Sequence, residues 1–505
     1  MKSKYFAPLL FLFLSLGLIA VTQSRSSQIK FEKSLQEKLL SGKTSTVLVL
    51  MKAKAYLKPA EQLESKNEKG RFVYEALRQV ALESQKDLVL MLDDKKVSYH
   101  RFYIANLIEL RNAPFELVAE IAKRPDVEKI YDNPYFTVKS PFFNQHLQDP
   151  PSLKLNHLNG NSKADPQASL VRVNAVRAWD ELGVKGKGIV VAGEDSGIEW
   201  DHPALIQHYR GDATHHDFNW HDAIREPLKA KQNPCGYDLA SPCDDGGHGT
   251  HTMGTVVGND GDQNIIGVAP EAQWIGCRNM DEGTGSPASY IDCFEFFLAP
   301  YAYHKNPMLD GDPTKSPHVI NNSWGCPIAE GCSGREMIPV LEALQSAGIF
   351  VVASAGNDGP ECSSVADQPA HLSSLAFSVG ALAEKEDTIA FFSSRGPSIL
   401  TGQTVPDLTA PGTNIRSSVP GKKYEGGWSG TSMAGPHVTG VVALLWSAAP
   451  KLIGHVKETM SLLRETAKPL TSTQTCGTTP GTQIPNNTFG YGLIDAHAAI
   501  LKARK

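Results

Sequence analysis

The most reactive combination of residue types in the sequence is an aspartate, a histidine and a serine that lie far apart along the chain. Asp195 closes an apolar run, His248 has a glycine on each side, and Ser432 follows a Gly-Thr pair ahead of a long apolar stretch. A histidine can take the proton of a serine hydroxyl at neutral pH, and an aspartate can hold the imidazole in the required tautomer. The three types together predict nucleophilic attack by a serine on a carbonyl group.

A fourth side chain, Asn357, ends a second apolar run. Its amide could donate a hydrogen bond to the negative oxygen formed in such an attack, beside the backbone N–H of Ser432 at a helix start. Each residue also has a plainer interpretation. Ser432 could cap a helix, and Asp195 and Asn357 could be turn residues. His248 could bind a metal with His251, although the glutamate of the H-E-x-x-H arrangement is missing.

The joint order of these residues is more specific than any one of them. Aspartate, histidine, asparagine and serine follow one another, and each lies in a motif that resembles the subtilase family. The resemblance covers about residues 169–499 and rests on Asp195-Ser196-Gly197-Ile198, His202-Pro203, His248-Gly249-Thr250-His251, Ala355-Gly356-Asn357 and Gly430-Thr431-Ser432-Met433-Ala434 with Pro436-His437. It implies that Ser432 is the nucleophile and that His248 is first its base and then the acid. Asp195 would orient His248, and Asn357 would donate to the oxyanion.

The resemblance also implies a cleft in which an extended peptide adds as a strand between two edge segments. The positions that match these segments and the first side-chain pocket are Gly283, Thr284, Gly285, Ser323, Trp324, Gly325, Ala353, Ser354, Ala355 and Gly356. The glycines could also serve ordinary turn geometry. Residues 277–297 further resemble one branch of the family, that of bacillopeptidase F. Protein or peptide substrates are the partners that this cleft predicts.

The elements that must position these residues can be read from the hydrophobic pattern. From residue 169 onward, short continuous apolar runs alternate with helical segments, a pattern typical of a buried parallel sheet in an α/β fold. The expected strands are 188–193, 273–277, 318–321, 349–353 and 376–379. In such sheets functional residues gather at the C-terminal ends of the strands. The sequence therefore predicts a three-layer, subtilisin-like domain over residues 169–505.

A smaller α+β domain is expected over residues 28–139. Its predicted strands are 45–51, 99–110 and 127–138, and its predicted helices are 70–92 and 115–122. A sheet covered by helices on one face fits this order. The subtilase resemblance identifies it as a ferredoxin-like propeptide, an intramolecular inhibitor of the same chain, although an unrelated secreted domain stays open. Residues 140–168 are rich in Pro, Asn, Ser and Lys and predict an exposed linker with the processing site.

The first 24 residues have the pattern of a cleaved signal peptide. Lys2 and Lys4 precede the apolar run 6–21, and a polar stretch follows. The run is short of the roughly 20 residues of a membrane-spanning helix, which is the alternative interpretation. We therefore expect a secreted or periplasmic protein with no stable membrane anchor.

The eight cysteines favour disulfide bonds in an exported protein. Cys235–Cys243 and Cys326–Cys332 are the preferred pairs because each closes a short loop, and Cys277–Cys293 and Cys362–Cys476 would remain. About a hundred pairings are possible in principle. Zinc binding is the alternative, but the sequence has no Cys-x-x-Cys pair.

Charge and ligand patterns limit the other partners. A net charge of −5 gives no basic surface of the kind that nucleic acid requires. The predicted chemistry needs no cofactor. Many subtilases hold calcium with an aspartate after His-Pro and with a loop side chain, but Ala204 and Gly261 occupy these positions. The usual tight site is therefore not expected, and a calcium ion elsewhere stays open. The insertion 205–242 holds four histidines and predicts a solvated surface loop in preference to a metal site.

Two other functions are alternatives to a broad degradative protease. A catalytically dead subtilase used as a binding scaffold would need a broken motif, and none of the four motifs is broken. A protease that matures one partner would keep the same chemistry as a broad degradative enzyme, and the sequence does not separate the two. The oligomeric state expected is a monomer.

Overall fold

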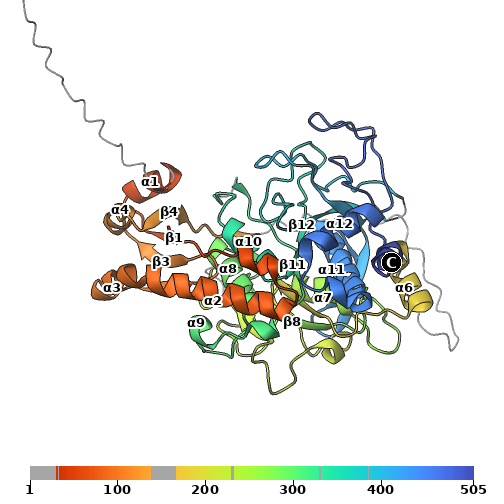
Figure 1. Cartoon of the computed structure of the whole chain (residues 1–505), viewed down its shortest axis with the longest axis horizontal. Coiled ribbons are helices and arrows are strands. Elements are labelled where there is room, and N and C mark those ends of the chain that lie inside the picture. The colour runs from red at the N-terminus through yellow and green to blue at the C-terminus, as the bar shows by residue number, and fades with distance from the viewer. Residues whose placement is uncertain (1–29, 32, 138–165, 229–232, 329–330, 385) are drawn as a thin grey trace, which may run out of the picture.

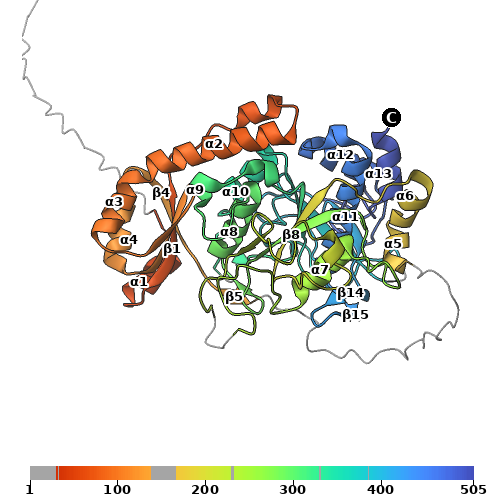
Figure 2. The same ribbon diagram turned by 90° about the horizontal axis from the view of Figure 1, so that it is seen from below.

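The computed structural model describes residues 30–31, 33–137, 166–228, 233–328, 331–384 and 386–505. The expected signal peptide and nearly all of the expected linker lie outside these residues. The described chain forms an N-terminal domain (residues 30–137) and a C-terminal domain (residues 166–505), which lie side by side in Figures 1 and 2.

A seven-stranded sheet forms the centre of the C-terminal domain. Its order is β13-β12-β11-β10-β6-β8-β7, and each neighbouring pair is parallel. The strands are β6 (Val190–Asp195), β7 (Trp220–Asp222), β8 (Gln273–Arg278), β10 (Val319–Asn322), β11 (Phe350–Ser354), β12 (Phe377–Leu382) and β13 (Leu408–Pro411). The mostly parallel, subtilisin-like α/β fold expected from the sequence is confirmed.

Both faces of this sheet are covered, which explains why its strands are apolar without alternation. In β6, Val191 belongs to one buried cluster, and Val190 and Ala192 belong to another on the opposite face. The first cluster includes side chains of α6 (Ala175–Leu182), α7 (His248–Val257), α11 (Thr431–Ala448), α12 (Val456–Thr466) and α13 (Ala496–Ala503). The second includes α8 (Pro287–Leu298) and α10 (Ile338–Ser346). The fold therefore has three layers.

The N-terminal domain has a four-stranded antiparallel sheet of order β2-β3-β1-β4. Its elements are α1 (Lys33–Leu40), β1 (Ser45–Met51), α2 (Lys66–Ser84), α3 (Lys86–Asp94), β2 (Tyr99–Phe102), β3 (Leu107–Ala113), α4 (Phe115–Ala122) and β4 (Val127–Asp132). Strand β1 and helix α4 match the predicted bounds. The strand order suits the ferredoxin-like arrangement that the sequence predicted.

Three elements expected to be continuous are each divided in the structure. Residues 99–110 form two strands, because Asn106 has a φ of 51° and turns the chain back. Residues 70–92 form two helices that meet at Gln85, whose amide donates to Phe102 O at 3.0 Å. After β4, the separate two-residue strand β5 (Phe136–Thr137) leaves the sheet of its own domain. Side-chain hydrogen bonds of this kind leave little trace in a hydrophobic pattern.

The insertion 205–242 is more ordered than its predicted solvated loop. Its segment Trp220–Asp222 is β7, the edge strand of the central sheet, and both end residues are buried. The Arg278 guanidinium, also buried, donates to both carboxylate oxygens of Asp222 at 2.9 and 2.7 Å. The prediction of a surface loop overlooked this strand, because three residues give too short a pattern to detect.

Four disulfide bonds join Cys235 to Cys243, Cys277 to Cys293, Cys326 to Cys332, and Cys362 to Cys476. The two short-range pairs and the two remaining pairs predicted from the sequence are confirmed. All four lie within the C-terminal domain.

Candidate active site

The pair Asp195 and His248 is built by the end of β6 and the beginning of α7. The Nδ1 atom of His248 lies 2.8 Å from each carboxylate oxygen of Asp195. Asp195 is buried, and its Oδ1 also accepts the N–H of Ser196 at 2.7 Å. A β-carbon at Gly249 would lie 2.0 Å from Gly197 O and 2.9 Å from Asp195 Cβ, so only glycine lets α7 approach β6 so closely.

The sequence analysis missed the residue that holds this helix start in place. Asp244 accepts hydrogen bonds from the N–H of Gly246 and of Gly247, from the N–H and hydroxyl of Thr250, and from the Ser196 hydroxyl, at 2.5–3.0 Å. Burial raises the pKa of Asp244, and these hydrogen bonds work in the opposite direction. An aspartate four residues before a Gly-flanked histidine was the available signal.

The charge around His248 suits a proton shuttle. Burial alone would lower its pKa, but the charge of Asp195, the hydrogen bond to it and the charge of Asp244 raise the pKa above the usual value. The imidazolium is therefore stabilised by its surroundings, which a base needs if it is to hold a proton during the reaction.

Ser432 is the second residue of α11, as expected for a serine at a helix start. Its hydroxyl donates to Ser323 O at 3.0 Å, and the Ser323 hydroxyl donates to Ser432 O at 3.2 Å. The second bond serves a carbonyl that would otherwise lack a helical partner, because Pro436, four residues on, has no N–H. Hydrogen bonds in both directions thus join the segment after β10 to Ser432.

Among the described residues, no hydrogen bond joins the hydroxyl of Ser432 to His248. The rings of His248 and Trp428 lie 6.3 Å apart, and Trp428 precedes Ser432 by four residues. Catalytic hydrogen bonds of this kind often form only once substrate is bound.

Asn357 is held by the same helix start. Its Oδ1 accepts the N–H of Thr431 at 2.9 Å and the Thr431 hydroxyl at 3.0 Å. Because both donors meet the oxygen, the amide nitrogen must face the other way. A β-carbon at Gly430 would lie 3.7 Å from this nitrogen. Asn357 Nδ2 is therefore next to the turn that carries Ser432, where an oxyanion donor is required.

The strand segment expected to bind substrate is already paired with the N-terminal domain. Strand β9 (Thr284–Gly285) pairs antiparallel with β5, which places Phe136 opposite Gly285 and Thr137 opposite Thr284. The two threonine hydroxyls lie 2.7 Å apart. Phe136 is buried, with its ring 5.8 Å from that of Tyr290. Gly283, which precedes β9, has a φ of 78°, a conformation that favours glycine.

The other predicted cleft residues come together around Ser432. Ser323, Trp324 and Gly325 follow β10 directly, Ala353 and Ser354 end β11, and Ala355 and Gly356 follow it. The Ser354 hydroxyl donates to Thr431 O at 3.0 Å, and the N–H of Gly356 donates to the Thr431 hydroxyl at 3.2 Å. Trp324 is buried, and its ring is stacked on Tyr290 at 3.5 Å. Its indole is therefore part of the buried core next to this segment.

Asp260 precedes Gly261 in the loop where many subtilases hold calcium, and its carboxylate makes hydrogen bonds within the protein. Asp260 accepts the N–H of Asp262, the N–H and amide of Asn264, and the hydroxyl of Tyr424, at 2.6–3.1 Å. Within the described parts of the chain, no group of three or more His, Cys, Asp or Glu side chains could hold a metal ion. His251, weighed as a metal ligand with His248, is buried and stacked on Trp428 at 4.4 Å.

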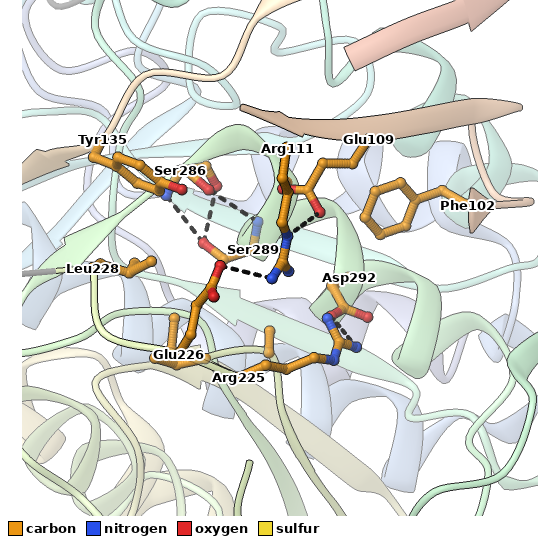
Figure 3. A pocket seen from close by; sticks show the side chains of 13 residues that line it. Phe102, Glu109, Arg111, Tyr135, Arg225, Glu226, Leu228, Ser286, Ser289 and Asp292 are labelled. Atoms are coloured by element: carbon orange, nitrogen blue, oxygen red, sulfur yellow. Dashed lines mark hydrogen bonds and ion pairs between the residues drawn. The ribbon is translucent and has the colours of Figure 1, made fainter. Parts of the chain in front are cut away.

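A second group of charged side chains lies between the domains (Figure 3). Arg111 of β3 pairs with Glu226 at 2.7 Å, and Arg225 pairs with Asp292 of α8 at 2.6 Å. They line a cavity of about 30 Å³, room for little more than one water molecule. Residues of both domains line this cavity, which is too small to hold a peptide side chain.

The fold and the site define a class of α/β protein in which Asp195 ends a parallel strand, while His248 and Ser432 lie at helix starts. The Subtilase family model matches residues 186–492, more than half of the chain. The chain therefore belongs to the subtilase family, as the motifs predicted.

Several named relatives support this assignment. Bacillopeptidase F of Bacillus subtilis (strain 168) is 35% identical over 94% of this chain but only 33% of its own length. Serine protease AprX of the same organism is 30% identical over 62% of this chain and 66% of that protein. Subtilisin E is 32% identical over 54% of this chain and 59% of that protein. The chain thus spans about a third of bacillopeptidase F.

Proposed function

We propose that this chain is an exported serine endopeptidase that hydrolyses peptide bonds and is made as a self-processed zymogen. The carrying observation is the contact of Asp195 with His248 beside a helix start that presents Ser432 and anchors Asn357. The family membership supports the same activity. The broad degradative role and the maturation of a single partner remain alternatives within this proposal.

In the proposed reaction, His248 Nε2 takes the hydroxyl proton while Ser432 Oγ attacks the carbonyl carbon of the scissile peptide bond. The carbonyl oxygen becomes negative and accepts hydrogen bonds from Asn357 Nδ2 and from the N–H of Ser432. Asp195 keeps the Nδ1 proton of His248 in place and stabilises the imidazolium. His248 then gives its proton to the leaving amine. Water, activated by the same histidine, hydrolyses the acyl-enzyme and restores Ser432.

The N-terminal domain is proposed to inhibit the site until it is cut. Its strand β5 occupies β9, the edge that a peptide substrate would need. Two further N–H groups, those of Tyr103 and Ile104, donate to the buried Glu295 carboxylate of α8 at 2.6 and 2.9 Å. These contacts hold the domain over the cleft, and a cut in the linker would release its tail.

Export is supported by the disulfide bonds, which form in oxidising compartments. Among the described residues, no helix has the length and apolar character to cross a membrane. The proposed enzyme acts as a monomer on protein or peptide substrates and needs no cofactor for the chemistry. Its inhibitor domain would cover residues 28–139 and its catalytic domain residues 169–505. A structural calcium ion is compatible with this function.

The test compares Ser432→Ala with the unchanged chain during export. The alanine variant should accumulate as a precursor, while the unchanged chain should lose roughly its first 115–145 residues at the exposed linker. Hydrolysis of denatured casein should fall by about 10⁶-fold, the loss in kcat that such a change causes in subtilisin. Ser447→Ala, in the same helix, is the matched control and should behave as the unchanged chain. Equal processing of both variants would overturn self-cleavage.

A further inference from the structure

An aspartate, Asp367, packs against Gly325, in one of the two segments that the sequence predicted as the edges of the cleft. A β-carbon placed on Gly325 would be 2.7 Å from Asp367 Oδ2 and 2.8 Å from Asp367 Cβ. The carboxylate therefore packs directly on the Gly325 backbone, which any other residue would displace. Gly325 and Asp367 are both partly exposed, while their chain neighbours Trp324, Cys326 and Gln368 are buried. The carboxylate thus lies where this segment opens to solvent.

The distance from Ser432 to the Asp367 carboxylate is comparable to the length of a long side chain. The Ser432 hydroxyl contacts Ser323 O at 3.0 Å, and Gly325 is two residues further along the same segment. Two residues of chain span at most about 7 Å. The four-carbon stem of a lysine, or the side chain of an arginine, covers a comparable length. A substrate residue bonded to the carbonyl that Ser432 attacks could therefore place its charge beside Asp367.

The position of Asp367 is fixed by its surroundings. The N–H of Cys326 donates to Gln368 O at 3.0 Å, and Cys326 is also bonded to Cys332. The buried Gln368 side chain accepts the N–H of Met337 at 3.2 Å and donates to Glu336 at 2.8 Å. A carboxylate held on so rigid a loop is a suitable selectivity group, because little ordering is needed when a cation binds.

The chain's own sequence supplies a matching cation. Phe136 and Thr137 run antiparallel to β9 as a substrate strand would, and the sequence continues with valine, lysine and serine. Lys139 is the first charged residue after Phe136 in the sequence. It lies outside the described residues, and only its place in the sequence is used. A strand that enters the cleft at β9 advances about 3.3 Å per residue toward Ser432.

We propose that Asp367 makes this cleft select lysine or arginine as the residue that donates the attacked carbonyl, and that self-processing follows Lys139. This inference rests on the proposed peptidase function and names its substrate class. A charge-assisted hydrogen bond between an ammonium or guanidinium and the carboxylate provides the selection. An acidic side chain at the same place would be repelled, and an aromatic one would leave the carboxylate poorly solvated.

The test uses peptides that differ only at this residue, with Lys, Arg, Gln, Phe or Glu. The processed enzyme should cleave the Lys and Arg peptides with kcat/KM about 10²-fold above those of Gln and Phe, the size of a charged hydrogen bond. Asp367→Asn should lower kcat/KM for Lys and Arg by a similar factor and leave that for Gln within about threefold. Glu361→Gln, an exposed acid of the same loop, should change none of them.

Two outcomes would overturn the inference: preferred cleavage of the Phe peptide by the unchanged enzyme, or an equal loss for every peptide in Asp367→Asn. Absence of cleavage of all peptides and of casein would instead count against the proposed function. Lys139→Gln provides a second measurement, since it leaves the C-terminal domain intact. Self-processing should slow about 10²-fold, and the mature N-terminus of the unchanged protein should be Ser140. Unchanged processing of Lys139→Gln would contradict the proposal.

Discussion

The candidate active site and the interface between the two domains both bury ionisable groups, with opposite effects on their charge. In the active site, Asp195 and Asp244 raise the pKa of His248 and favour its charged form. In the interface, burial lowers the pKa of Lys66 to about 7 and that of His100 well below the usual value. The comparison indicates that one region is arranged to hold a proton and the other to exclude it. We therefore expect the stability of the docked N-terminal domain and the activity of the site to depend on pH through different residues.

The two ends of the interface are far apart. Helix α2 runs from the N-terminal sheet across the C-terminal domain (Figure 2). At its far end the buried Lys66 Nζ donates to Ser316 O at 3.2 Å and to the Ser316 hydroxyl at 2.5 Å. Lys69 Nζ donates to Gly454 O at 3.0 Å. This contact does not use the cleft, so it should survive the cut that frees β5.

The largest effect expected is confined to the active site. Asn357→Ala should lower kcat by about 10²–10³-fold, because one oxyanion donor is lost. Asn357→Asp is the matched variant: it keeps oxygen atoms that can accept from Thr431 but has no amide to donate, and it should lose at least as much. Steady-state kinetics on one peptide would measure both.

The two Asn357 variants also separate effects on the active site from effects on the interface between the domains. The stability of the full-length precursor should change little in Asn357→Asp, because the groups that dock the N-terminal domain are untouched. Activity in Asn357→Ala within a factor of three of the unchanged enzyme would remove Asn357 from the proposed mechanism.

A smaller effect is expected from Lys66→Met at the far end of α2. The pKa of Lys66 is about 7 when docked and near 10.5 when exposed, so its contribution to stability is present above 10.5 and is lost as pH falls to 7. Methionine fills a similar volume without an amine. In the Ser432→Ala precursor, Lys66→Met should flatten the rise in unfolding free energy between pH 7 and 10, measured by denaturant unfolding. An unaltered slope would show that the amine is solvated.

The smallest effect is expected at His100 of β2. Burial, then the charge of Arg225, lowers its pKa, while Asp292 opposes this; Arg111 and His221 add weaker positive charge. A lowered pKa means that stability present above pH 6.5 is lost as the pH falls. His100→Phe should reduce this loss between pH 6.5 and 5 in the same unfolding measurement. A steeper loss in the variant would contradict the assignment.

The sequence predicted most of the C-terminal sheet because its strands are continuous apolar runs. Strand β7 was not predicted, because the three residues Trp220–Asp222 are too few to show a period. Strand β13, which ends in a proline, was not predicted either. In the N-terminal domain the turn at Asn106 depends on a positive φ that the hydrophobic pattern does not encode. Local patterns thus locate long elements well and short ones poorly.

The candidate site was predicted from motifs, and the structure adds the contacts that no motif contains. Asp195, His248, Asn357 and Ser432 were expected as a group because they follow the family order. Asp367, by contrast, becomes visible only through its contact with Gly325, 42 positions earlier in the chain. Long-range contacts of this kind follow from the tertiary fold and could not be read from spacing.

The distribution of cysteines has a consequence for how the proposed inhibition would end. All eight lie between residues 235 and 476, so no covalent bond crosses to the N-terminal domain apart from the main chain itself. For the inhibition proposed above, the whole chain keeps the N-terminal domain at an effective concentration on the order of millimolar. After one cut this tether is lost and only non-covalent contacts hold the two pieces together, so their separation then depends on dilution.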